Sequence, residues 1–142
     1  MEKVILYTDG GARGNPGPAG IGVVVTNVSG EVLQTANKFI GETTNNEAEY
    51  QAVILGLETL KKFLGKEKIK NTEVELKLDS ELVAKQLRGE YQTREERLWP
   101  YFMNIWNARV ADFSHLTITH IPREENSAAD KLANEAMDFA TQ

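Results

Sequence analysis

The sequence has no cysteine, no long hydrophobic run and no excess of positive charge, and each absence excludes a class of protein. Without cysteine, the 142 residues offer no disulfide, no thiolate nucleophile and no cysteine-based zinc or iron–sulfur site, which suits the cytoplasm. No apolar run approaches the ~20 residues that span a bilayer, and the N-terminus lacks the apolar region of a secretory signal. The net charge of −5 argues at first against a nucleic-acid partner, because phosphates attract positively charged proteins.

Length and composition predict one folded domain over residues 1–142. Hydrophobic residues make up 41% of the chain and charged residues 26%, proportions that are typical of a globular protein. No internal repeat or linker interrupts the chain, and a protein of this size buries roughly 68–70% of its unfolded surface. We expect a single cytoplasmic domain that acts as a monomer.

The hydrophobic pattern alternates between strand and helix periods along the chain. Short β-branched runs predict strands, and apolar residues three and four positions apart predict helices. Thr44 followed by Glu47 is typical of a helix start, and Gly65 of a helix end. The expected strands cover residues 4–7, 21–26, 32–40, 74–78 and 116–121, and the expected helices cover residues 45–64, 81–87, 94–111 and 127–137.

The order of these elements, β-β-β-α-β-α-α-β-α, predicts an α/β fold. The first three strands follow one another closely, which favours antiparallel pairing. The later strands are reached through helices, and such crossovers make parallel neighbours. The sequence therefore predicts a five-stranded mixed sheet flanked by helices.

Four acidic residues stand at positions where an acid is informative. Asp9 and Asp79 end strands, where sites form in α/β sheets, although both also suit a turn or cap. Glu49 lies one helical turn before Val53 on the core-facing stripe, which is costly unless a Lys, an Arg or a metal ion binds it. Asp130 lies near the start of the last helix, where the helix dipole alone favours an acid.

Convergence of these acids would predict a metal site. Carboxylates that gather in one place repel each other, and their pKa values rise unless cations neutralise them. Oxygen ligands without a thiolate favour Mg²⁺ or Mn²⁺ over zinc.

The segments that carry the four acids resemble the motifs of type 1 ribonuclease H. Residues 8–22, TDGGARGNPGPAGIG, are similar to the opening strand and turn of that family. TNNEAE at residues 44–49 resembles its helix start, and LDS at residues 78–80 resembles a later strand end. HIPREENSAAD at residues 120–130 is similar to the last strand and the loop before the final acid. The resemblance covers essentially the whole chain in order.

This resemblance implies a ribonuclease H-like fold, with strands 1–3 antiparallel and strands 4 and 5 parallel to strand 1. It implies an endonuclease that hydrolyses the RNA strand of RNA/DNA hybrids and leaves 5′-phosphate and 3′-hydroxyl ends. Asp9, Glu49, Asp79 and Asp130 match the ligands of two Mg²⁺ ions, for which Mn²⁺ is the substitute. Activity on double-stranded RNA and a non-catalytic hybrid-binding domain are the alternatives.

The same resemblance assigns a substrate surface to the glycine-rich turn and the helix start. Glycines permit close approach of backbone amides, and a helix start offers further donors to phosphates. A plain hairpin turn and a helix cap are the simpler interpretations. The residues assigned to the substrate are Gly10, Gly11, Arg13, Asn15, Thr44, Asn45, Asn46 and Ser80.

Two features depart from the pattern of many members of this family. Residues 80–112 contain five basic and five acidic residues, so the basic protrusion that grips DNA is missing and we expect weaker hybrid binding. Trp99 and Trp106, at helical spacing, are expected in the core rather than as stacking platforms. The family's mobile histidine is matched by His120 or by Arg123, and Arg123 is preferred as the group that assists turnover because it lies in the loop itself.

Overall fold

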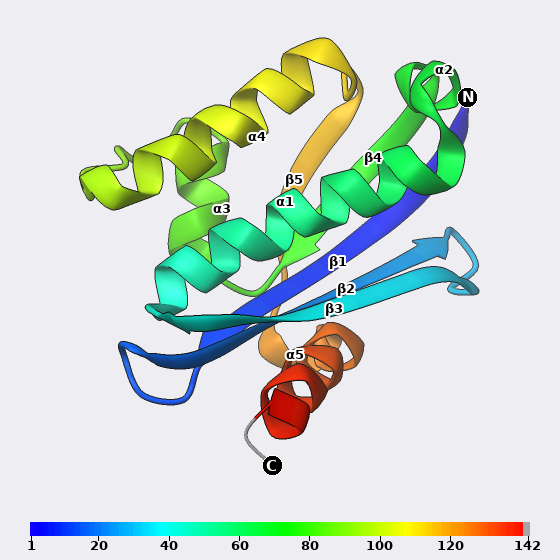
Figure 1. Ribbon diagram of the computed structural model, residues 1–142. Coiled ribbons are helices and arrows are strands. Elements are labelled where there is room, and N and C mark those ends of the chain that lie inside the picture. Colours follow the sequence, from blue (N-terminus) through cyan, green and yellow to red (C-terminus); the bar gives the residue numbers. More distant parts are fainter. Residues whose placement is uncertain (141–142) are drawn as a thin grey trace.

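Five strands form one mixed sheet in the computed structural model, which describes residues 1–140. The sheet order is β3-β2-β1-β4-β5 (Figure 1). Strand β2 pairs antiparallel with β1 and β3, whereas β4 pairs parallel with β1 and β5. The predicted α/β fold and its mixed sheet are therefore confirmed. The strands are β1 (Glu2–Ala12), β2 (Gly17–Asn27), β3 (Val32–Thr43), β4 (Thr72–Leu78) and β5 (Leu116–His120).

Helices cover both faces of this sheet. Helices α1, α3 and α4 lie on one face, and α5 lies on the opposite face against β2 and β3 (Figure 1). Among residues 1–140, no helix combines the length and apolar composition that a bilayer crossing requires. The helices are α1 (Asn45–Leu64), α2 (Lys66–Lys70), α3 (Glu81–Leu87), α4 (Trp99–Ala111) and α5 (Ser127–Ala140), and the 3-10 turns are η1 (Glu96–Leu98) and η2 (Arg123–Glu125).

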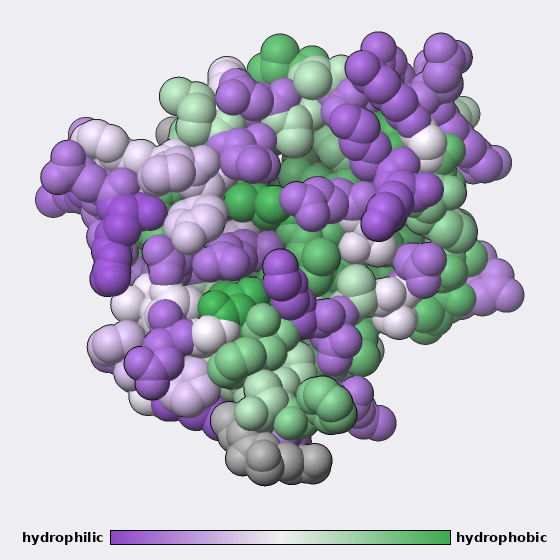
Figure 2. All heavy atoms as spheres, in the orientation of Figure 1, coloured by the Kyte–Doolittle hydropathy of each residue, from purple (hydrophilic) through white to green (hydrophobic). Residues whose placement is uncertain are grey.

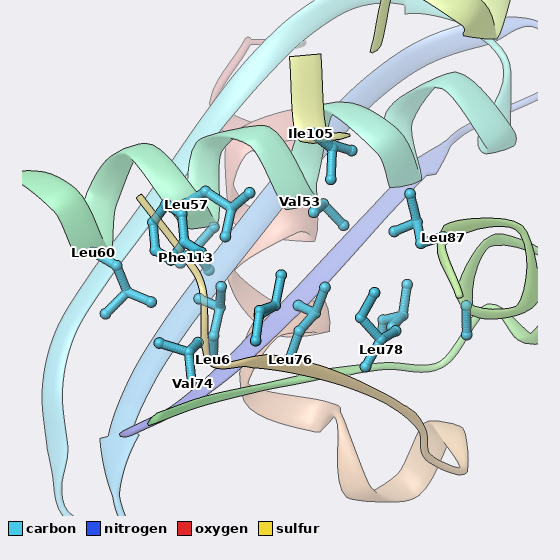
Figure 3. Packing of buried hydrophobic residues seen from close by; sticks show 14 of the residues in the cluster. Leu6, Val53, Leu57, Leu60, Val74, Leu76, Leu78, Leu87, Ile105 and Phe113 are labelled. Carbon is cyan, nitrogen blue, oxygen red and sulfur yellow. The ribbon is translucent and has the colours of Figure 1, made fainter. Parts of the chain in front are cut away.

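The main core lies between α1 and the central strands. Leu6 of β1 and Leu76 of β4 point from the sheet toward Val53 and Leu57 of α1 (Figure 3), and all four are at most 3% exposed. Burial of such side chains is the main favourable contribution to folding. This packing fixes α1 over β1, which decides where the acid on α1 lies.

Helix α1 begins and ends where the sequence predicts. The Thr44 hydroxyl accepts a hydrogen bond from the Glu47 backbone amide at 3.2 Å. Gly65 ends the helix with a φ of +86°, a conformation that glycine adopts without strain. Helix α2, which carries Lys66, Lys68 and Lys70, follows at the opposite end of α1 from Glu49 (Figure 1). Hydrophilic side chains gather in this region of the surface (Figure 2).

Several predicted bounds differ from the structure, and β2, for example, begins at Gly17 rather than residue 21. Strand β1 continues to Ala12, so Asp9 lies within the strand instead of ending it, because β2 pairs with β1 beyond the point where β4 stops. Helix α4 begins at Trp99 rather than residue 94, with Pro100 in its first turn, where a proline costs no hydrogen bond. Ile121 lies outside β5, which ends at His120.

The prediction that Trp99 and Trp106 pack in the core is wrong. Their exposed fractions are 51% and 52%, and Met103 and Val110 on the same side of α4 are also exposed. Helix α4 instead presents Ile105 to the core. Because apolar residues occupy more than one face of α4, helical spacing could not tell which face is buried.

Candidate functional site

Asp9 and Asp79 meet at the carboxyl end of the two central parallel strands. The last paired residues of β1 and β4 are Thr8 and Leu78, and the two acids follow them directly. At this edge of an α/β sheet, side chains from neighbouring strands point into one crevice. The strand pairing therefore brings together two carboxylates that are 70 residues apart in the sequence.

Glu49 reaches the same place from α1. The Gly10 backbone amide donates a hydrogen bond of 3.4 Å to Glu49 Oε1. A Cβ atom on Gly10 would collide with the Ala48 carbonyl oxygen, so the missing side chain lets α1 rest directly on β1. This close contact positions the carboxylate of Glu49 above the Asp9 strand.

Three of the four predicted acids form one group. Carboxylate oxygens of Asp9, Glu49 and Asp79 are within 4.8 Å of one another. Asp130, in the first turn of α5, is not part of this group, but its charge contributes to raising the pKa of Asp9. Asp9 thus occupies the centre of the site.

The site is electrostatically strained without a cation. Burial, followed by the negative charge of Asp79, raises the pKa of Asp9 from 3.8 to about 7. Burial and the charge of Asp9 raise the pKa of Glu49 well above its usual value. The site therefore binds protons, or other positive charge, in preference to existing as free carboxylates.

A divalent cation fits these residues better than a cationic side chain does. Glu49 Oε2 is buried and has no hydrogen-bond partner, and no ion pair recorded for residues 1–140 involves any of the four acids. The alternative that Glu49 pairs with a buried Lys or Arg is therefore wrong. Clustered carboxylate oxygens without nitrogen or sulfur ligands are typical of Mg²⁺ and Mn²⁺ sites.

The predicted substrate surface is held together by two asparagines. Asn15 Oδ1 accepts a hydrogen bond from the Asn45 backbone amide at 3.0 Å, and Asn45 Oδ1 accepts one from the Ala12 amide at 2.8 Å. Both asparagines are exposed, and their oxygens rather than their NH₂ groups make these bonds. The turn and the helix start therefore form one surface that keeps two side-chain NH₂ donors for another molecule.

Several of the other residues assigned to the substrate have structural partners within the protein. Thr44 caps α1, and Ser80 caps α3 by accepting a 3.2 Å hydrogen bond from the Val83 amide, so both cap interpretations are confirmed. Arg13 is directed toward α5, where it pairs with Asp138 at 2.6 Å. Gly11 and Asn46 are half-buried beside the acids and the helix start.

Neither candidate for the mobile group belongs to the carboxylate cluster. His120 is the exposed last residue of β5. Arg123 is exposed in η2, between β5 and the helix that carries Asp130. Both lie on the connection that leads to Asp130.

Known proteins are similar to this chain in fold and in sequence. A family model described as reverse transcriptase-like matches residues 7–136. The structure of LC11-RNase H1, isolated from compost by a metagenomic approach, has a TM-score of 0.94 and 49% identity, with 100% of both chains covered. The chain belongs to the type 1 ribonuclease H family. A second structure of LC11-RNase H1, in complex with an RNA/DNA hybrid, matches this ribonuclease H with the same TM-score of 0.94 and identity of 49%, over 98% of this chain and 99% of that one.

Two curated relatives of this ribonuclease H differ from it in length. Ribonuclease HI of Halobacterium salinarum is 41% identical over 97% of this chain and 66% of its own length. A bifunctional protein of Mycobacterium tuberculosis is 40% identical over 99% of this chain, but the match spans only 37% of that protein. The chain thus corresponds to one part of the longer mycobacterial protein.

Gly10→Ala will destabilise the protein by about 1–3 kcal/mol, because the new methyl group must push α1 away from β1. The same displacement moves Glu49 away from Asp9, so metal-dependent activity will fall at least about tenfold. Urea unfolding measures the first effect. Gly11→Ala is the matched control for stability, since the nearest atom to its Cβ would be 3.9 Å away. Equal stability of the two variants would contradict the close-contact argument.

Proposed function

We propose that this ribonuclease H hydrolyses the RNA strand of RNA/DNA hybrids with two Mg²⁺ ions, leaving 5′-phosphate and 3′-hydroxyl ends. The observation that carries the proposal is the group of carboxylates of Asp9, Glu49 and Asp79 within 4.8 Å of one another, which no ion pair recorded for residues 1–140 neutralises. The complex of LC11-RNase H1 with an RNA/DNA hybrid, at 49% identity, supports the choice of substrate.

The four acids have distinct places around the proposed ions. Bound at these carboxylates, divalent ions supply an activated water and stabilise the leaving 3′ oxygen. Asp9 is grouped with Glu49 and Asp79, and the charge of Asp130 also acts on it, so we assign it a share in holding both ions. Glu49, Asp79 and Asp130 would supply the other carboxylates that hold the two ions.

The surface beside the acids positions the hybrid. Asn15 and Asn45 offer exposed side-chain NH₂ groups next to the glycine-rich turn and the N-terminus of α1. Such donors suit the minor-groove edges and phosphates of a duplex. Discrimination of the hybrid requires that this surface contact 2′-hydroxyls on one strand and a deoxy backbone on the other.

Cleavage of duplexes with one labelled strand tests the proposal. We expect the RNA strand of RNA/DNA to be cut in Mg²⁺ or Mn²⁺, with no cutting in chelator and none of DNA/DNA. Cutting of RNA/RNA as well would support the broader substrate. Binding of the hybrid without cleavage in every metal would overturn the enzymatic proposal, and the end groups of the products test the chemistry.

Hybrid binding will depend only moderately on salt, because few basic side chains between β4 and β5 are free for phosphates. Lys85 pairs with Glu81 at 2.9 Å and Arg88 with Glu90 at 2.5 Å. We expect fewer than about four phosphate contacts, and a slope of log affinity against log salt shallower than about −4. A salt titration in Ca²⁺, which limits turnover, measures it. A steeper slope would show a phosphate-binding surface elsewhere on the chain.

Arg123→Ala will lower turnover of the hybrid about tenfold, a barrier change of about 1.4 kcal/mol, because Arg123 lies on the connection that carries Asp130. His120→Ala will stay within about twofold of the parent, since His120 is the last residue of β5 and does not belong to the loop before Asp130. Arg97→Ala, an exposed arginine in η1, is the control for loss of charge alone. Full turnover of Arg123→Ala with loss in His120→Ala would reverse the assignment.

A further inference from the structure

The side chain of Asn126 is buried, although it follows an exposed turn. The residue is 1% exposed, whereas all three residues of η2 before it are exposed. A primary amide in such a place is costly unless its polar atoms form hydrogen bonds. The sequence assigns Asn126 no role of its own within the segment at residues 120–130, so its burial calls for a reason.

Both hydrogens of the Asn126 amide are used by the strands that carry the acids. Nδ2 donates to the Thr8 carbonyl oxygen at 2.9 Å and to Asp79 Oδ2 at 3.3 Å. A carbonyl and a carboxylate only accept, so the NH₂ group and not the amide oxygen must face them. The amide oxygen is buried with no partner, which shows that the two donated bonds determine how the side chain is placed.

These bonds lie at the point where the sheet divides. The ladder between β1 and β4 ends at the pair Thr8 and Leu78, and Asp9 and Asp79 come immediately afterwards. Beyond that pair no backbone hydrogen bond between the two strands is recorded for residues 1–140. The Asn126 amide cross-links the two strands there, by binding the residue before Asp9 and the carboxylate of Asp79 itself.

The backbone of Asn126 extends the same connection to the fourth acid. Its carbonyl oxygen accepts a hydrogen bond from the Asp130 amide at 3.1 Å, in the first turn of α5. One residue is thus bonded to Asp79, to the neighbour of Asp9 and to Asp130. Since the charges of Asp9 and Asp79 repel each other, a fixed donor on Asp79 holds it close to Asp9 against that repulsion.

We propose that Asn126 is a positioning residue that sets the spacing of Asp9, Asp79 and Asp130 for the metal ions without touching ions or substrate. The proposal rests on the proposed function in that it assumes divalent ions bind these acids. Donors in contact with metal-binding carboxylates orient them, and their loss typically costs 10–100-fold in metal affinity or activity.

Mn²⁺ binding to the protein without substrate tests this directly. We expect Asn126→Ala to weaken Mn²⁺ binding about 10–100-fold in a titration followed by electron paramagnetic resonance. Asn37→Ala is the matched control, because Asn37 Nδ2 also donates to a backbone carbonyl, that of Leu132, at 2.9 Å but away from the acids. Unchanged Mn²⁺ affinity in folded Asn126→Ala would overturn the proposal.

Cleavage kinetics separate positioning from substrate contact. Because Asn126 is buried, Asn126→Ala will lower kcat and leave KM for the hybrid within about twofold. A rise in KM with unchanged kcat would overturn the proposal. If the parent binds Mn²⁺ but cuts no hybrid, the proposed function fails, while the difference in Mn²⁺ affinity still decides the role of Asn126.

The parent protein alone decides the matter if Asn126→Ala does not fold. The side-chain NH₂ protons of Asn126 must exchange slowly with water, and their NMR signals must shift when Mg²⁺ is titrated. Fast exchange, or signals that do not respond to Mg²⁺, would overturn the proposal.

Discussion

Asp9→Asn will cleave the RNA strand of a hybrid at least about 10³-fold more slowly than the parent, a loss of about 4 kcal/mol of transition-state stabilisation. The amide has the shape of the acid but lacks its charge, and Asp9 is the acid that is grouped with Glu49 and Asp79 and on which the charge of Asp130 also acts. At pH 8 without metal, the same variant will be more stable than the parent. Removing the carboxylate removes a buried charge whose pKa is raised to about 7.

Asp112→Asn is the matched control for both effects. Asp112 is also a buried acid, with 6% exposure, but its Oδ2 lies 2.9 Å from the Lys61 ammonium. Its loss will therefore lower stability and leave cleavage unchanged. Single-turnover cleavage of labelled hybrid and urea unfolding in chelator measure the two quantities. If Asp9→Asn cuts within tenfold of the parent, or is less stable at pH 8, the metal site is wrongly assigned.

Mg²⁺ will stabilise the protein strongly at pH 8 and only slightly at pH 5. In the unfolded chain the pKa of Asp9 is 3.8, and in the folded protein it is about 7. Between these values the folded state binds more protons, so without metal the free energy of unfolding falls as pH rises, by at most about 4 kcal/mol from this group. Glu49 contributes in the same direction because its pKa is also raised.

The reason for the metal effect is competition with protons. At pH 5 the buried acids hold protons, and Mg²⁺ must displace these protons to bind. At pH 8 the acids are charged and repel one another, and Mg²⁺ binding reduces this repulsion. Urea unfolding at both pH values, in Mg²⁺ and in chelator, measures the difference. Because other acids titrate too, Asp9→Asn is the reference. Equal stabilisation by Mg²⁺ at both pH values would contradict the prediction, as would parallel pH curves for parent and variant.

The sequence predicted the acids well because their placement is encoded locally. Asp79 follows a clear alternating strand, and Glu49 stands on a helix whose Thr44 cap and Gly65 end are visible in the sequence. Those local signals, together with the family motifs, sufficed to predict the mixed sheet and the group formed by Asp9, Glu49 and Asp79.

Other features depend on partners far away in the sequence. The extension of β1 past Asp9 requires β2, and the burial of Asn126 requires Thr8, 118 residues earlier. The two tryptophans of α4 were misplaced because the sequence does not say which of its apolar faces meets α1. Arg13 was assigned to the substrate, and its contact with Asp138 of α5 is likewise non-local.

The arrangement of the acids on β1, α1, β4 and α5 also affects how the protein acquires activity during synthesis. Asp130 and Asn126 belong to the last segment that the ribosome makes among residues 1–140, and α5 closes the face of the sheet opposite α1. A nascent chain that lacks this segment has neither the fourth acid nor the Asn126 cross-link. Under the proposed function, the metal site is therefore complete only after α5 has been made.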